Sequence, residues 1–272
     1  MNARTDLLGL ASEMTHADYL AVQALSASGL KKLRQSPAHF YGTTLDPKRP
    51  AEEPSEALQA GSLLHCAVLE PEQLHARYVA KPSGMNFSTK EGKAWRDAQT
   101  RQIVTAESWA TAQAQASALR ALPDVRQLLS VGRAECSAFW IDGETSVLCK
   151  CRPDWHTPAG NGVILLDLKT CQDASPDGFA RAVARYGYHL QAAHYSAGFQ
   201  AATGQPVLGF VFAAVEADWP HAAALYMLTD DDLTAARTEV RRLTQLYADC
   251  LASGVWPGYA SEIQTLSLPS WA

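Results

Sequence analysis

The sequence lacks the long apolar runs, repeats and nucleotide-binding loops that mark several large protein classes. No run approaches the ~18–20 apolar residues that cross a membrane, and the apolar residues 7–11 are too few for the core of a signal peptide. Neither a glycine-rich phosphate loop nor a nucleophile elbow is present, so nothing supports a small-molecule α/β enzyme. With 272 residues and 47% hydrophobic content, we expect a single domain over residues 1–272 that makes no membrane contact.

The six cysteines include no CxxC pair, which is a common spacing in zinc and redox sites. Cys149 and Cys151 are two residues apart on an expected strand and would share one of its faces. The main interpretation is that they are small apolar strand residues, and zinc or iron–sulfur ligation is the alternative. Reduced thiols favour a cytoplasmic location.

Positive charge is also scarce. The formal net charge is -5, so the chain as a whole is not a basic nucleic-acid binder, and any DNA contact must come from a local patch. Two stretches could supply such a patch or could be ordinary solvated surfaces: the helix start at 26–34, and residues 81–101, where basic residues alternate with Phe87 and Trp95. The candidate DNA-binding residues in them are Ser28, Lys31, Lys32, Arg34, Lys90, Lys93 and Arg96.

Helical patterns fill residues 1–130, and strand patterns begin near residue 134. The expected helices are those starting after Ser26, those at 56–69, 105–123, 175–203 and 230–252, and a short one after Pro123. The expected strands are 138–141, 147–152, 163–170, 207–215 and 223–227, of which the first three should form a meander. We therefore predict an α/β (α+β) fold with a helical part at 1–130, a central mixed sheet with flanking helices at 131–255, and a tail at 256–272 that packs on the surface or on another subunit.

The apolar strand 163–170 carries charged residues that need a reason, because an unpaired charge in an apolar setting costs several kcal/mol. Asp167 and Lys169 point to the same face, because side chains alternate along a strand. The turn-forming residues 157–162 suggest a hairpin, which would bring Asp154 next to Asp167. Two carboxylates beside a lysine suit a divalent cation held next to a phosphate.

Four further residues are weighed with this group. His65 lies on the apolar helix 56–69, where a histidine is more often a hydrogen-bonded core residue than a metal ligand. Gln191 and Tyr195 share a helix face, and core packing competes with a functional role for Tyr195. Glu135, just before the first strand, is a possible additional acid.

Pro153-Asp154 and Asp167-Leu168-Lys169, placed at two strand ends, resemble the paired motifs of the PD-(D/E)XK nuclease superfamily. The run from Gln191 to Tyr195 is similar to the QxxxY helix motif of its RecB-type branch. The segments Ser36-Pro37-Ala38-His39-Phe40, Gly61-Ser62-Leu63-Leu64-His65 and Tyr186-Gly187-Tyr188-His189-Leu190-Gln191 resemble the RecE-type exonucleases (exodeoxyribonuclease VIII). No cysteine lies near Ser36-Pro37, so we expect no iron–sulfur cluster.

The resemblance implies a Mg²⁺-dependent exonuclease that digests one strand of linear double-stranded DNA from 5′ to 3′ and leaves a 3′ single-stranded tail. It also implies a ring-shaped homo-oligomer that is paired with a single-strand annealing protein in recombination. An endonuclease of the same superfamily and an inactive DNA-binding or assembly subunit are the alternatives.

On the same resemblance, the implied metal ligands are His65, Asp154, Asp167 and the backbone carbonyl of Leu168, a set that suits Mg²⁺, with Mn²⁺ as a substitute. Lys169 would hold the attacking water or a phosphate oxygen as a compact point charge. Gln191 and Tyr195 would orient that lysine or the phosphate. The implied catalytic residues are Asp154, Asp167, Lys169, Gln191 and Tyr195.

Overall fold

A mixed sheet lies at the centre of the molecule, as the sequence predicts, and it has five strands. The computed structural model describes residues 7–50 and 55–268, and its strand order is β10-β9-β8-β7-β4. β8 and β9 are parallel, and the other neighbours are antiparallel. The strands are β4 (Arg133–Ala134), β7 (Trp155–Ala159), β8 (Gly162–Cys171), β9 (Val207–Glu216) and β10 (Ala223–Tyr226).

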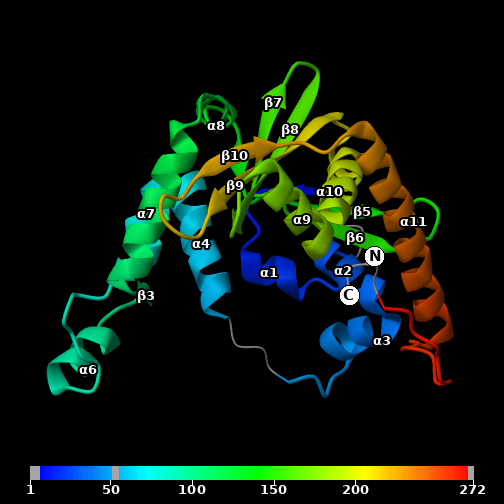
Figure 1. Ribbon diagram of the computed structural model, residues 1–272, viewed down its shortest axis with the longest axis horizontal. Coiled ribbons are helices and arrows are strands. Elements are labelled where there is room, and N and C mark those ends of the chain that lie inside the picture. Colours follow the sequence, from blue (N-terminus) through cyan, green and yellow to red (C-terminus); the bar gives the residue numbers. More distant parts are fainter. Residues whose placement is uncertain (1–6, 51–54, 269–272) are drawn as a thin grey trace.

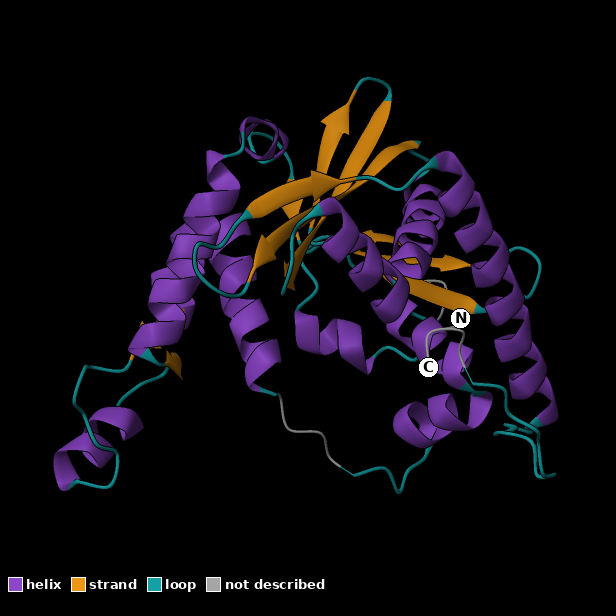
Figure 2. Cartoon of the chain, viewed as in Figure 1, coloured by secondary structure: helices purple, strands orange, loops and turns teal. Residues whose placement is uncertain are grey.

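Helices cover both faces of this sheet (Figures 1 and 2). α4 (Glu56–Leu69) and α7 (Ala106–Ala121) pack on one face, in a cluster that includes Leu166 and Leu168 of β8. α9 (Pro176–Tyr186) and α10 (Tyr188–Thr203) pack on the other face, in a cluster that includes Leu165. β8 is apolar on both faces because it is buried on both. The remaining helices are α1 (His16–Ala21), α2 (Ala27–Gln35), α3 (Pro37–Phe40), α5 (Leu74–Arg77), α6 (Lys90–Asp97), α8 (Pro123–Leu128) and α11 (Asp230–Ser253).

The predicted three-strand meander is wrong in its connections. β5 (Ser137–Ile141) and β6 (Leu148–Cys151) form a separate sheet with β1 (Gly9–Ala11), in the order β1-β5-β6. The chain then enters β7, which uses Thr157–Ala159 of the stretch expected to be a turn, and the turn itself contains Gly160 and Asn161. Pro158 is tolerated in β7 because β4 pairs only with Trp155 and His156, so no strand needs an N–H at that position.

The predicted helix 175–203 is two helices, and Gly187 separates them. Gly187 has φ 64°, a left-handed conformation that glycine adopts without a steric penalty, and its N–H donates to the carbonyl of Val183. α9 therefore ends at Tyr186, and α10 starts in a new direction at Tyr188. The helices predicted at 56–69 and on either side of Pro123 are present, and the Ser26 side chain caps α2 by accepting the N–H of Gly29 at 3.3 Å.

A projection and a tail leave the core. The parallel pair β2 (Tyr78–Ala80) and β3 (Gln102–Val104) is the base of residues 81–101, which carry α6 away from the sheet (Figure 1). At the other end, Trp256 stacks on Phe40 at 5.5 Å between ring centroids, and the chain beyond it is exposed up to residue 268. The last four residues of the expected tail lie outside the described residues.

Cys149 and Cys151 are both buried in β6 as free thiols, consistent with small apolar strand residues. Within residues 7–50 and 55–268, the metal-compatible group of side chains contains no cysteine. None of the helices in that part of the chain combines the length and apolar character that a membrane span requires.

Candidate active site

Asp154 and Asp167 lie at the same end of the β7–β8 hairpin, as the sequence predicts. Trp155 pairs with Leu166, so the residues just beyond this pair face each other across the two chains. Asp154 lies just before β7, where its Oδ2 accepts the backbone N–H of Leu168 at 2.6 Å. The two acids are almost fully buried, at 8% and 1% exposure.

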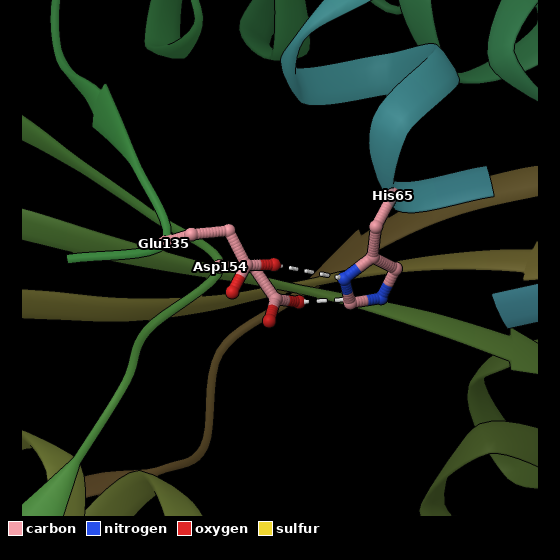
Figure 3. A group of neighbouring side chains, drawn as sticks. All are labelled: His65, Glu135 and Asp154. Atoms are coloured by element: carbon pink, nitrogen blue, oxygen red, sulfur yellow. Dashed lines mark ion pairs between the residues drawn. The ribbon is translucent and has the colours of Figure 1, made fainter. Parts of the chain in front are cut away.

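His65 of α4 points at two carboxylates (Figure 3). Its Nδ1 lies 3.5 Å from Oε1 of Glu135, and its Nε2 lies 3.6 Å from Oδ2 of Asp154. Glu135 is fixed by its own backbone N–H, which donates to the carbonyl of Asp154 at 3.0 Å, and by Arg152, whose Nε donates to its Oε2 at 2.8 Å. One ligand atom from each of His65, Glu135 and Asp154 can be chosen so that all lie within 4.8 Å of one another.

Asp167 is held in a second, adjoining group on the α10 side of β8. Its Oδ1 accepts a hydrogen bond from Nε2 of Gln191 at 2.5 Å, and its Oδ2 forms an ion pair with Lys169. The Lys169 ammonium also lies 4.8 Å from the ring centroid of Tyr188, at the start of α10. Within the described residues, the carboxylate of Asp167 is not part of the His65 group, so the expected ligand set converges only in part.

Asp154 links the two groups. It touches His65 on one side and the backbone of Leu168, the neighbour of Asp167, on the other. In an extended strand the N–H and C=O of one residue point to the same side, so the Leu168 carbonyl also points toward the β7 side. A cavity of about 850 Å³ exposes the His65 group, and Tyr195 lines it.

The pKa values reflect the crowding of charge around His65. Burial lowers its pKa, but the charges of Asp154 and Glu135 outweigh burial and raise it to about 9. Burial outweighs the opposing charge of His65 and, together with the charge of Asp167, raises the pKa of Asp154 to about 7. Burial also acts to raise the pKa of Glu135, but His65 and Arg152 hold it below its usual value. The protonated His65 ring thus balances the negative charge of the Glu135 and Asp154 carboxylates.

A divalent cation could supply that charge instead. Ligands on opposite sides of one Mg²⁺ are about 4.2 Å apart, twice the usual Mg–O distance of about 2.1 Å, so a group spread over 4.8 Å needs little movement to share an ion. Two carboxylates match a hard cation, and the imidazole widens the choice to Mn²⁺. The residues present therefore fit a divalent metal.

The candidate DNA-binding residues divide between two places. Lys31 of α2 is near the site: its ammonium lies 5.0 Å from the centroid of the same Tyr188 ring that Lys169 contacts. Burial and, to a smaller extent, the charge of Lys169 lower the pKa of Lys31 to about 8. Ser28, Lys32 and Arg34 also lie on α2, whereas Lys90, Lys93 and Arg96 lie on α6, well away from α2 (Figure 1).

Glu135 is the residue that sequence reasoning most underrated. From its position just before a strand, Glu135 was predicted only as a possible additional acid. The sequence did not point to Arg152 as the partner of Glu135 or to Tyr188 as the ring beside Lys169. Glu135 has φ 54°, an uncommon conformation for a residue other than glycine, and this backbone turn aims its side chain at His65. The sequence offers one signal for Glu135 as a site residue. It is an acid between Gly132 and the expected strand at 138–141, upstream of Pro153-Asp154.

Comparison with known proteins agrees with this geometry. Residues 26–269 match the family described as PDDEXK-like domain of unknown function (DUF3799), whose superfamily of nucleases generally uses divalent metals. No curated protein matches the chain. A solved structure from Eubacterium rectale, described as a "Putative exonuclease", has the same fold, with a TM-score of 0.64 and 16% identity over 95% of this chain and 96% of that one.

Two other solved structures are too different for their folds to carry an argument. SSO0001 has a TM-score of 0.30 and 14% identity over 68% of this chain and 86% of that one. The protein VC1899 from Vibrio cholerae has a TM-score of 0.22 and 13% identity over 89% and 62%. The family match covers most of the sequence, and the chain belongs to the PDDEXK-like family within the PD-(D/E)XK nuclease superfamily.

Proposed function

We propose that this protein is a Mg²⁺-dependent exonuclease that digests linear double-stranded DNA from 5′ to 3′ and leaves 3′ single-stranded tails. The observation that carries the proposal is the group of His65, Glu135 and Asp154, which lies beside Lys169 of β8 because Asp154 contacts the neighbouring residue Leu168. A cation site next to a buried ammonium is suited to an anionic substrate with a scissile phosphodiester.

His65, Glu135 and Asp154 would hold the cation, with Asp167 and the Leu168 carbonyl next to them. A divalent cation bound there would polarise the phosphodiester and lower the pKa of a water molecule, which is the chemistry that such ions supply. Arg152 keeps Glu135 in place through its 2.8 Å hydrogen bond. The Leu168 N–H does the same for Asp154.

Lys169 would act as a fixed positive charge. Burial lowers its pKa, but the charges of Asp167 and Asp154 more than compensate, so its pKa is raised and the amine stays protonated at neutral pH. It can therefore hold a phosphate oxygen or the attacking water as a charged hydrogen-bond donor. Gln191 orients it indirectly, by donating to the Asp167 carboxylate that pairs with it.

Lys169 is not the only positive charge in its surroundings. Lys31 and Lys169 contact one tyrosine ring, and Asp167 is the carboxylate in direct contact with Lys169. Burial, and after it the charge of Lys169, lowers the pKa of Lys31, and the negative charge of a nearby phosphate would stabilise both ammonium groups. This supports binding of the DNA backbone on the Tyr188 side of the site, while Tyr195 lines the cavity on the His65 side.

Attack from DNA ends, the 5′ to 3′ polarity and the recombination role rest on the resemblance of the motifs to the RecE-type exonucleases. The fold shared with the "Putative exonuclease" of Eubacterium rectale is compatible with them. On the same basis we propose a ring-shaped homo-oligomer that works with a single-strand annealing protein.

The decisive experiment is a nuclease assay on two substrates, a linear duplex labelled at one end and a closed circular duplex. Each is incubated with and without Mg²⁺. Release of the 5′ label only in Mg²⁺, with the circle left intact, is expected. Linearisation of the circle would instead identify an endonuclease. Tight metal binding in calorimetry without any cleavage would identify an inactive binding subunit.

A further inference from the structure

The projection at residues 81–101, here called the basic arm, carries positive charge that the core does not use. It contains five Lys or Arg side chains and two Asp or Glu side chains, a net charge of +3, whereas the whole chain has a net charge of -5. Lys90, Lys93 and Arg96 of α6 are all exposed. Arg96 is partly neutralised by Asp97 at 2.8 Å, which leaves the two lysines as the freer charges of this helix.

The basic arm is a built structure rather than a loose loop. Phe87 and Trp95 stack at 6.1 Å with an angle of 18° between their planes, and the Lys81 ammonium lies 4.5 Å from the centroid of Phe87. Gly92 lets α6 pack closely, since a Cβ there would come within 2.0 Å of the carbonyl oxygen of Asn86. The two aromatic rings thus pack within the arm, and the exposed side chains on its outer surface include Lys90 and Lys93.

The two strands from which the arm extends border the active-site cavity. That cavity is lined by His65 and Asp154 at its centre and by Arg77, Tyr78 and Gln102 toward the arm. Tyr78 and Gln102 begin the two strands, β2 and β3, between which the arm extends. A molecule that leaves the cavity over Tyr78 and Gln102 passes the base of the arm.

We propose that the basic arm binds the phosphate backbone of duplex DNA that extends from the active-site cavity, an inference that rests on the proposed function. Duplex DNA presents a regular row of phosphates, and Lys90 and Lys93 can neutralise these without reading sequence. Because Phe87 and Trp95 face each other, the arm holds the backbone and does not stack on bases. The contact would keep the uncut duplex aligned while its end is processed.

The test compares wild type with a Lys90→Gln/Lys93→Gln variant in fluorescence anisotropy, using catalytically inert Ca²⁺, several salt concentrations and duplexes of increasing length. Each phosphate contact contributes about 0.9 to the slope of log affinity against log salt, so losing two should lower the slope by about 1.8. The loss of affinity should grow with duplex length, because a short duplex seated at the active site ends before the arm.

A matched control is Arg237→Gln/Arg242→Gln, which removes the same charge from exposed positions on α11, at the opposite side of the molecule (Figure 1). The proposal would be overturned if the arm variant kept the wild-type slope of log affinity against log salt, or if the control lost as much slope as the arm variant. An unchanged slope in the arm variant would favour an acidic protein as the partner of the arm. The two proposals fail separately. A chain that binds duplex through the arm but cuts nothing contradicts the nuclease function, and a chain that cuts with an indifferent arm contradicts only this inference.

Discussion

Glu135→Gln tests whether the site is the three-residue group seen here or only the paired acids that the motifs suggest. Glutamine has nearly the shape of glutamate but lacks its charge. The Glu135 carboxylate lies 3.5 Å from Nδ1 of His65. At an effective dielectric constant of about 20, a unit charge at that distance contributes about 4–5 kcal/mol, and a divalent cation shared by the group would lie no farther from the Glu135 carboxylate, so its attraction to that carboxylate is at least as large.

The Glu135 side chain is 26% exposed, so water and side-chain motion reduce this interaction. If about half is lost to screening, about 2 kcal/mol remains, and the variant should bind Mg²⁺ or Mn²⁺ about 30-fold more weakly. Isothermal titration calorimetry measures this change directly, and circular dichroism checks that the fold survives.

The matched control is Glu70→Gln. Glu70 lines the same cavity but is paired with Arg77 through two hydrogen bonds and lies outside the metal-compatible group. Its variant should bind metal nearly as well as wild type. If Glu135→Gln binds metal as tightly as the control does, then Glu135 is not a ligand, and the donor set must be completed by Asp167.

Four other outcomes are expected. Asp167→Ala should lower cleavage by at least about 10²-fold with the fold intact, because it removes several kcal/mol of charge stabilisation near the metal; unchanged activity of the purified variant would exclude the role. Lys169→Ala should abolish cleavage but still bind DNA in Ca²⁺, whereas loss of binding would point to a purely electrostatic role. Burial lowers the pKa of His194 to about 4, so between about pH 6.5 and pH 4 the unfolded chain binds a proton at this residue and the folded chain does not. The free energy of unfolding should therefore fall by up to about 1.4 kcal/mol per pH unit as the pH drops through that range. In urea unfolding, His194→Gln should lose less stability than wild type over the same range, and an equal loss would contradict this. Gly187→Ala should cost about 1–2 kcal/mol because alanine resists φ 64°, whereas Gly61→Ala in α4, where a Cβ meets nothing within 4 Å, should be neutral or stabilising in the same urea assay.

Local signals in the sequence were sufficient to define some elements. α4 runs from Glu56 to Leu69 as predicted, because Ser55 caps its start and Pro71 follows its end. The meeting of Asp154 with Asp167 was also predictable from the acid before the turn residues and the acid on the following strand, although the hairpin that unites them is formed by β7 and β8 and not by the strand predicted at 147–152.

Other features depend on partners that are distant in the sequence. β1 pairs with β5 across more than 120 residues, so nothing near either strand assigns β5 and β6 to a separate sheet. β7 was mistaken for a turn because its proline is acceptable only at an edge that β4 leaves unpaired.

The site was incomplete for the same reason. Glu135 joins it only because a positive φ turns its side chain toward a helix that precedes it by some 70 residues, and Lys31 approaches Lys169 only through Tyr188. Such meetings follow from tertiary packing, which no local pattern encodes.

The late start of β7 has a consequence for how the fold could tolerate change. Because β7 pairs with β8 only up to Trp155, none of the described strands lies beside the outer edge of β8 from Asp167 onward. There the carboxylate of Asp154 accepts the Leu168 N–H in place of a strand partner. The backbone there is left open for chemistry. An insertion that let β7 begin earlier and pair with β8 beyond Leu166 would cover the Leu168 carbonyl with strand hydrogen bonds. The sheet would be more regular, but it would leave no room for a substrate.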